Sequence, residues 1–110
     1  MFARHVSMKM KANSAPEFSR IIANEIIPLL RKEKGFEDEI TFIAPERSEA
    51  TAITFWTTKE NAEAYHRTRY TEVLKALAKV VDGTPKVEMF EVSYSTFHKL
   101  AKAAKASFLN

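Results

Sequence analysis

TFWTTKENAEAYHR, residues 54–67, joins the end of a predicted strand to the start of a predicted helix. Branched and aromatic residues dominate its first part, as is typical of a β-strand, and this part ends at Trp56, the only tryptophan of the chain. Thr57 is followed three residues later by Glu60, which is the capping-box pattern found where helices begin. The stretch therefore predicts a strand that passes directly into a helix, and this helix carries His66 among its polar side chains.

The residues before this stretch predict a β-hairpin. FEDEITFIA at 36–44 and ATAITFWT at 50–57 are rich in branched and aromatic side chains, and the polar segment PERSEA between them is typical of a turn. The first run is expected to place four apolar side chains on one face: Phe36, Ile40, Phe42 and Ala44.

The N-terminal residues 2–11 alternate between two sets of side chains, which predicts a half-buried strand. His5 shares its side of the strand with Ser7 and Lys9. The first set is Phe2, Arg4, Val6, Met8 and Met10, and the second is Ala3, His5, Ser7, Lys9 and Lys11.

A helix is predicted to begin after Ser14, because Ser14 and Glu17 form a second capping box. Pro16 lies in the first turn, where its missing N–H is harmless. Gly35 is a natural C-terminal stop for this helix. Its apolar residues recur at steps of three and four: Phe18, Ile21, Ile22, Ile26, Leu29 and Leu30.

Pro28 interrupts this first helix. Inside an α-helix it removes the hydrogen bond to the carbonyl of Asn24 and its ring clashes there, which costs about 3 kcal/mol unless the helix bends. The sequence therefore predicts a kink near residues 24–28.

The remaining residues complete the order of elements. The second helix is expected to extend its apolar stripe to Val81 and to end at DGTP, residues 82–85. PKVEMFEVSYSTF, residues 85–97, fits a fourth strand. The order β-α-β-β-α-β predicts a ferredoxin-like α+β fold, in which a four-stranded antiparallel sheet carries both helices on one face.

Length and composition fit one domain. The 110 residues are 45% hydrophobic and 28% charged, and the net charge is only +3. We expect residues 1–97 to form the domain and residues 98–110, with Lys99, Lys102 and Lys105, to form a basic C-terminal helix or tail. The chain contains no cysteine, no apolar run of the roughly 18 to 20 residues that span a bilayer and no secretory-signal pattern. These features predict a cytoplasmic protein without a membrane segment.

Large apolar side chains occupy both faces of the predicted hairpin. Two helices cover only one face of a sheet, so a second surface must cover the other. The economical solution is a second copy packed sheet against sheet, which predicts an isologous homodimer. Ile43, Ile53 and Phe55 are expected in one register, and Ile40, Phe42 and Trp56 in the other.

Three runs of the sequence resemble the antibiotic biosynthesis monooxygenase-like family of dimeric α/β barrels: ARHVSMKMK, LLRKEKGF and TFWTTKENAEAY. The resemblance covers about residues 2–97. Its most specific part is the pair GF at 35–36 after the first helix, together with Trp56 at a strand end followed by a capped helix. The resemblance implies that the predicted homodimer is a dimeric α/β barrel.

Members of this family include oxygenases that oxidise electron-rich phenols and quinols with O2 and no metal or flavin, and the resemblance places their pockets between sheet and helices. Other members degrade heme with an asparagine on the first strand, a tryptophan in the second helix and a histidine ligand further along that helix. The corresponding positions here hold His5, Tyr65 and Lys75. Because the axial histidine is missing, the resemblance predicts an oxygenase without a cofactor and not a heme-degrading enzyme.

Oxidation of a small aromatic substrate with O2 needs a base, hydrogen-bond donors for the oxygen atoms and an apolar wall that excludes water. Histidine is the natural base, because its pKa is near neutral. On the second helix, His66 and Tyr70 are four residues apart. Tyr65 and Arg69 have the same spacing, so each pair can share a face of the helix. The hypothesis assigns His66, Tyr65 and Trp56 as catalytic residues, and His5, Arg69 and Tyr70 as substrate-binding residues.

The same residues have plainer interpretations. Trp56 at a strand end is typical of a core, and Tyr65 and Tyr70 on an apolar stripe usually bury their rings and expose their hydroxyls. His66 is also typical of a solvent-facing helix surface. His5 equally fits a polar sheet surface, a dimer contact or a pocket lining. A non-catalytic dimer that binds a small apolar ligand therefore stays an alternative, as does a partner docked by the basic tail.

Other kinds of site find no support in the sequence. The three histidines lack the spacing of a metal-ligand pair. Gly35 and Gly83 are expected at helix ends and not in a phosphate-binding loop. A GxSxG nucleophile motif is absent, and so is the K/R-G-F/Y signature of RNA-recognition strands. We therefore expect no metal, no cofactor and no nucleic-acid partner.

Overall fold

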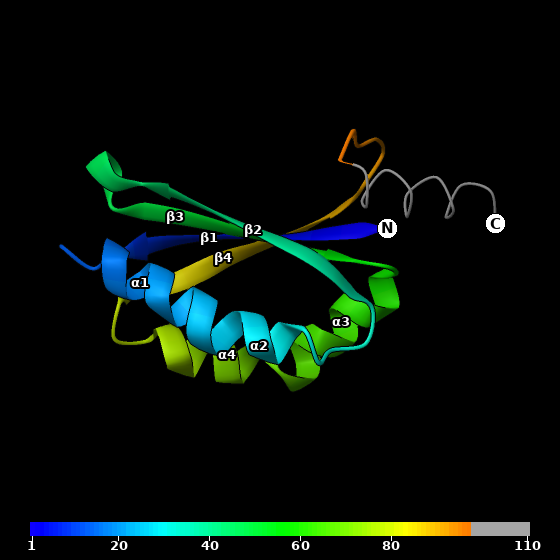
Figure 1. Cartoon of the computed structure of the whole chain (residues 1–110), viewed down its shortest axis with the longest axis horizontal. Coiled ribbons are helices and arrows are strands. Elements are labelled where there is room, and N and C mark those ends of the chain that lie inside the picture. The colour runs from blue at the N-terminus through cyan, green and yellow to red at the C-terminus, as the bar shows by residue number, and fades with distance from the viewer. Residues whose placement is uncertain (98–110) are drawn as a thin grey trace.

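In the computed structural model, which describes residues 1–97, four antiparallel strands form one sheet in the order β2-β3-β1-β4 (Figure 1). The strands are β1 (Phe2–Met10), β2 (Phe36–Ala44), β3 (Glu49–Trp56) and β4 (Val81–Glu91). The helical elements are α1 (Ala15–Ile21), the π-helical turn η1 (Ile22–Ile26), α2 (Ile27–Leu30), the 3-10 turn η2 (Pro45–Arg47), α3 (Lys59–Thr68) and α4 (Tyr70–Leu77). Helices α1 to α4 lie against one face of the sheet, which confirms the predicted ferredoxin-like α+β class (Figure 1). The predicted basic tail lies outside the described residues.

The first helix is interrupted where Pro28 predicts it. The N–H of Ile27 donates to the carbonyl of Ile22, five residues earlier, so this turn is π-helical and not α-helical. A turn with this wider spacing accommodates a proline that supplies no N–H of its own. The irregularity at the predicted position is the turn η1, and Ile22 and Ile26 of this turn are buried in the core.

The capping box predicted for the first helix does not form. Ser14 is the N-cap residue of α1, but its backbone has helical angles, and its hydroxyl donates to the carbonyl of Ala12 instead. A capping side chain reaches the first turn only from an extended N-cap residue. Glu17 forms ion pairs with Arg20 and Lys79 and is therefore not available for capping.

The cap of α3 lies one residue later than the sequence predicts. Thr58 is extended, and its hydroxyl oxygen accepts a hydrogen bond from the backbone N–H of Asn61 at 3.1 Å. Thr57 accepts from the side-chain amide of the same asparagine at 2.9 Å, and its own N–H donates to the carbonyl of Gly35. Asn61 therefore supplies the donors at this helix start, in place of the predicted pair of Thr57 and Glu60.

Gly35 is expected to tolerate no side chain. Its φ is +83°, and a Cβ at this position would overlap the side chain of Asn61. Gly83 is a matched control, because its φ is +69° but a Cβ there would meet no atom within 4 Å. We expect Gly83→Ala to lower the free energy of unfolding by about 1–2 kcal/mol, the cost of a left-handed backbone, and Gly35→Ala to lower it further. Urea unfolding of both variants checks this order, and equal losses would contradict the clash with Asn61.

The fourth strand begins earlier than predicted. Helix α4 ends at Leu77, and Val81, which was expected on the helix stripe, is the first residue of β4. Residues 82–85 do not terminate a helix but lie inside the strand, where the register against β1 shifts. This irregularity accommodates Gly83 with its positive φ and Pro85 without an N–H, because β4 is an edge strand.

Both faces of the sheet carry apolar side chains, as predicted, but the membership of each face differs. A register shift after Phe36 turns this residue toward the helices, where its ring meets Trp56 edge-on at 5.7 Å between centroids. Ile43 also packs against the core cluster and so shares the face of Trp56. The face away from the helices carries Ile40 and Phe42 of β2, Ile53 and Phe55 of β3, and Phe90 of β4.

The core lies between the sheet and the helices. On β1 the side chains of Val6, Met8 and Met10 are buried, whereas Lys9 is exposed, which confirms the predicted alternation. Arg4 lies on the buried side and is only 2% exposed. A charged side chain therefore stands among the largest fully buried ones: Trp56, Arg4, Phe18, Ile21 and Leu30.

Candidate functional site

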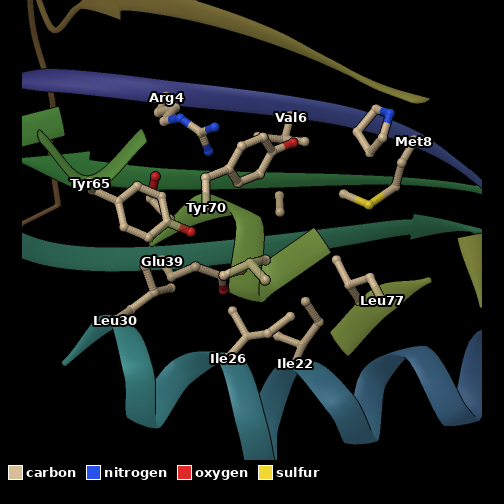
Figure 2. Close-up of a pocket in the computed structure, with 14 residues that line it drawn as sticks. Arg4, Val6, Met8, Ile22, Ile26, Leu30, Glu39, Tyr65, Tyr70 and Leu77 are labelled. Atoms are coloured by element: carbon tan, nitrogen blue, oxygen red, sulfur yellow. The ribbon is translucent and has the colours of Figure 1, made fainter. Parts of the chain in front are cut away.

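A cavity of about 30 Å³ lies between the sheet and the helices. Its lining is mostly apolar, and Figure 2 shows side chains of the first helix on one side and Arg4 of β1 on the other. The polar lining side chains are Arg4, Glu39, Thr54, Tyr65 and Tyr70. This volume is enough for a water molecule or two, so a ring-sized ligand fits only after lining side chains have moved.

Arg4 is held in the cavity wall by aromatic rings. Its guanidinium carbon lies 4.0 Å from the ring centroid of Tyr70 and 5.2 Å from that of Tyr65, within the range of cation–π contacts. One terminal nitrogen, Nη2, donates to Nδ1 of His66 at 2.8 Å. The Nε–H of Arg4 is buried and has no hydrogen-bond partner among the described residues.

Within residues 1–97, the positive charge of Arg4 has no carboxylate partner. Burial lowers the pKa of Arg4, and the groups that oppose this effect are Tyr65 and Tyr70, not an acid. Guanidinium nevertheless stays protonated in proteins. Buried arginines are nearly always paired with an anion, so an unpaired one within residues 1–97 marks this cavity as unusual.

Tyr65 lies beside Arg4 in the cavity lining, and Trp56 supports it from the core. Their rings stack at 4.9 Å between centroids, and Trp56 is completely buried. Burial raises the pKa of Tyr65 to about 12, although Arg4 acts in the opposite direction. The Tyr65 hydroxyl is therefore protonated at neutral pH and able to donate. Trp56 donates its ring N–H to the Thr54 hydroxyl at 2.8 Å and supports Tyr65 without lining the cavity itself.

His66 lies outside the cavity and contacts it through Arg4. An arginine only donates, so Nδ1 of His66 must accept, and the proton of the neutral ring is on Nε2. The imidazole stacks on Tyr70 at 5.2 Å between centroids. Its exposed edge contributes with Glu63, Arg67, Val87 and Met89 to a surface groove beside β4.

Lowering the pH is expected to weaken the contact between Arg4 and His66. The pKa of His66 lies below its ordinary value, because partial burial and then the charge of Arg4 disfavour the imidazolium. The folded protein thus binds fewer protons here than the unfolded chain, whose histidine pKa is about 6.5. The stability contributed by the neutral His66 is fully present above the pKa of the unfolded chain. It is lost as the pH falls from that pKa through the lower pKa of His66 in the folded protein.

Urea unfolding between about pH 7 and pH 5 measures this loss. His66→Gln is the matched control, because its amide oxygen still accepts from Arg4 and does not titrate. We expect the unfolding midpoint to fall less in His66→Gln than in the wild type. An equal fall in both proteins would show that the contact does not depend on the charge of His66.

Two of the predicted substrate-binding residues lie away from the cavity. Arg69 is exposed and forms ion pairs with Glu33 at 3.7 Å and Glu72 at 3.0 Å. The backbone N–H of Arg69 donates to the carbonyl of Tyr65 at 2.9 Å, but the chain leaves regular helical angles at Arg69, and this residue does not line the cavity. His5 lies on the other face of the sheet, where its ring meets Phe90 edge-on at 6.2 Å. Of this predicted group, only Tyr70 lines the cavity.

Sequence reasoning missed two residues of the site, Arg4 and Glu39. Arg4 gave a signal, because it interrupts the apolar side of an alternating strand. Glu39 gave no such signal, since the register shift after Phe36 decides which face of β2 carries its side chain. Its carboxylate accepts a hydrogen bond from the Thr41 hydroxyl, and burial raises its pKa above the ordinary value.

Neither a metal centre nor a membrane-spanning helix is found among the described residues. No group of three histidine, cysteine, aspartate or glutamate side chains within residues 1–97 is arranged to hold a metal ion. None of the helices there has both the length and the apolar character that a membrane crossing requires.

Comparison with solved structures identifies the fold. A candidate antibiotic biosynthesis monooxygenase from Bordetella bronchiseptica is 16% identical, with 83% of this chain and 95% of that chain covered and a TM-score of 0.71. A mutant of SnoaB, a cofactor-independent oxygenase from Streptomyces nogalater, is 14% identical, with 87% and 96% covered and a TM-score of 0.70. This chain has the fold of the antibiotic biosynthesis monooxygenases.

A third structure with this monooxygenase fold has a ligand bound. It is a monooxygenase from the gene ActVA-Orf6 of Streptomyces coelicolor in complex with Nanaomycin D, 13% identical, with 87% of this chain and 90% of that chain covered and a TM-score of 0.72. Identities this low establish a shared fold and not a shared substrate. No family model matches the sequence, and no curated protein matches it either.

Proposed function

We propose that this protein is a cofactor-independent monooxygenase that oxidises a small phenolic or quinol-type compound with O2 in the cavity beside Arg4. The observation that carries the proposal is the buried guanidinium, which packs against two tyrosine rings and forms no ion pair with any carboxylate of residues 1–97. A positive charge in an apolar site stabilises the ionised form of a phenol, and this form is the electron-rich species that reacts with O2. The names of the similar structures support the reaction class.

The overall reaction balances without an added reductant. The phenol loses one hydrogen from a ring carbon and one from its hydroxyl, and the ring carbon gains one oxygen atom of O2 as a second carbonyl. The other oxygen atom leaves as water, with electrons that come from the substrate itself. Arg4 stabilises the negative charge of the ionised phenol, and the protonated Tyr65 hydroxyl donates a hydrogen bond to an oxygen atom.

Glu39 is the proposed base. Its carboxylate lines the same cavity as Arg4, and its raised pKa brings it closer to the neutral range in which a base exchanges protons with a phenol efficiently. This role replaces the one expected for His66, whose hydrogen bond holds Arg4 from outside the cavity. Trp56 acts by positioning Tyr65, against which it stacks.

Oxygen uptake tests the proposal. Chelator-treated protein is mixed with 1-naphthol and a panel of related phenols and quinols, and the consumption of O2 is compared with that in buffer alone. With ¹⁸O2, we expect one labelled atom in the organic product and the other in water. Uptake no faster than in buffer for every compound of the panel would contradict the oxygenase assignment.

A non-catalytic binding protein is the second candidate. The observation that favours it is the small, mainly apolar cavity, from which His66 and Arg69 are absent. It predicts that phenols raise the melting temperature without any consumption of O2, because a ligand that binds only the folded state stabilises it.

We also propose that a second copy covers the free face of the sheet, forming a homodimer. Phe42 and Phe90 on this face are 56% and 50% exposed, and Ile40, Ile53 and Phe55 lie on the same side. Contiguous apolar surface of this kind usually marks an interface, and a self-complementary face pairs two copies.

Phe42→Glu is expected to convert the dimer into a monomer, since a carboxylate would be buried without a partner at the interface. Lys75→Gln on α4 changes the net charge by the same amount on the opposite side of the molecule and is expected to leave the dimer intact. Sedimentation velocity distinguishes the two masses. A monomeric wild type, or a dimeric Phe42→Glu variant, would contradict this interface.

A further inference from the structure

We infer that the Arg4 cavity selects a ligand in its ionised form: a small aromatic compound whose anionic oxygen accepts a hydrogen bond from Nε of Arg4. The anion can be a phenolate or an aromatic carboxylate, because both present the same acceptor. The inference rests on the proposed function only for the location of the site. Binding of an anion needs no O2 and is measured separately.

The first observation is the unpartnered donor. Arg4 is 2% exposed, and its Nε–H has no partner in the described part of the chain, although the great majority of buried polar groups have one. Nη2 is already occupied by His66, so the contact that holds the guanidinium in place leaves Nε free. A single acceptor in the cavity would satisfy this donor.

The second observation is the uncompensated charge. A water molecule in the cavity would satisfy the Nε–H but would leave the charge of Arg4 without a counterion. The titratable groups around it come from three elements: Tyr65 and His66 on α3, Tyr70 on α4 and Glu39 on β2. Glu39 lines the cavity but forms no ion pair with Arg4, so an anionic ligand is the partner that the site lacks.

The third observation concerns the shape of the site. Figure 2 shows the Arg4 guanidinium beside the tyrosine rings, with Ile22, Ile26 and Leu30 across the cavity. An aromatic ring of the ligand would lie between these apolar side chains, with its charged oxygen toward Arg4. The space must widen for this, and Met8, which has an unbranched and adaptable side chain, is part of the lining.

The test uses 4-nitrophenol under nitrogen, because its phenolate absorbs visible light and its bound protonation state is therefore measurable. We expect the wild type to bind the phenolate about 10- to 1,000-fold more tightly than the neutral 4-nitroanisole, which is the range produced by an adjacent arginine. Arg4→Met keeps a long side chain without the charge and is expected to abolish this preference. Benzoate in the same assay distinguishes a carboxylate ligand from a phenolate.

Equal binding of 4-nitrophenol and 4-nitroanisole, or an unchanged preference in Arg4→Met, would overturn the inference. Failure of 4-nitrophenol and benzoate to bind at all would also overturn it, since the cavity would then hold water only. Should Arg4→Met not fold, Arg4→Lys provides the second test, and we expect it to keep a weaker preference for the phenolate. Preferential phenolate binding without any O2 consumption would remove the oxygenase proposal and leave this inference standing. Consumption of O2 by the wild type, together with an unchanged phenolate preference in Arg4→Met, would remove this inference and leave the oxygenase proposal standing.

Discussion

Replacing Trp56 by alanine is expected to lower the free energy of unfolding by about 3–5 kcal/mol, the usual cost of removing a large buried aromatic side chain. Trp56 is completely buried, and its ring touches Tyr65 at 4.9 Å and Phe36 at 5.7 Å between centroids. Its ring N–H also bonds to the Thr54 hydroxyl inside the core. The variant thus loses packing on two sides and leaves a buried hydroxyl without its donor.

Urea unfolding monitored by circular dichroism measures this effect. Trp56→Phe is the control, because it keeps an aromatic ring against Tyr65 and Phe36 and removes only the N–H and part of the volume. We expect its loss to be well below that of Trp56→Ala. If Trp56→Ala unfolded at the same urea concentration as the wild type but had lost activity, Trp56 would be a catalytic residue and not the support that its burial indicates.

Arg4→Met is expected to lower the turnover of a phenolic substrate by about 10²- to 10³-fold, the usual effect of removing one electrostatic donor from an active site. The same variant should unfold at the same or a higher urea concentration. A buried charge without an ion pair costs desolvation, and replacing it by an apolar side chain of similar length is often neutral or stabilising. Loss of activity without loss of stability is therefore the expected pattern.

Steady-state kinetics and unfolding of the same preparations check this pattern. His66→Gln is the matched control, since it keeps an acceptor for Arg4 and leaves the guanidinium charge in place. We expect it to retain most of the turnover. If Arg4→Met were strongly destabilised while its remaining folded fraction was fully active, Arg4 would hold the core together and would have no role in turnover.

The fold was predictable from the sequence because local patterns and packing agree. The alternation in β1, the glycine after the first helix and the threonine-rich start of α3 all indicate the elements that form. Boundaries were less predictable where tertiary contacts decide them. Val81 continues a helical stripe in the sequence, but its pairing with Met10 of β1 makes it the first residue of β4.

The site was only partly predictable. Tyr65 and Tyr70 follow from the stripe of the second helix, but Arg69 forms ion pairs with Glu33 and Glu72 at the surface and does not line the cavity. The strand pattern placed Arg4 among apolar neighbours without showing whether it would be paired. Whether a buried charge has a partner depends on residues far away in the chain, here His66 and Tyr70, and this information appears only in the folded structure.

A crystal structure of the protein with 4-nitrophenol, grown under nitrogen, shows whether Arg4 binds a phenolate in the cavity. We expect the nitrophenol ring between sheet and helices, with its oxygen about 2.7–3.2 Å from Nε of Arg4. We also expect Met8 and neighbouring side chains to have moved and to have enlarged the present volume of about 30 Å³. A cavity of unchanged volume that holds only water, with the ligand absent or bound elsewhere on the protein, would show that Arg4 does not bind this anion.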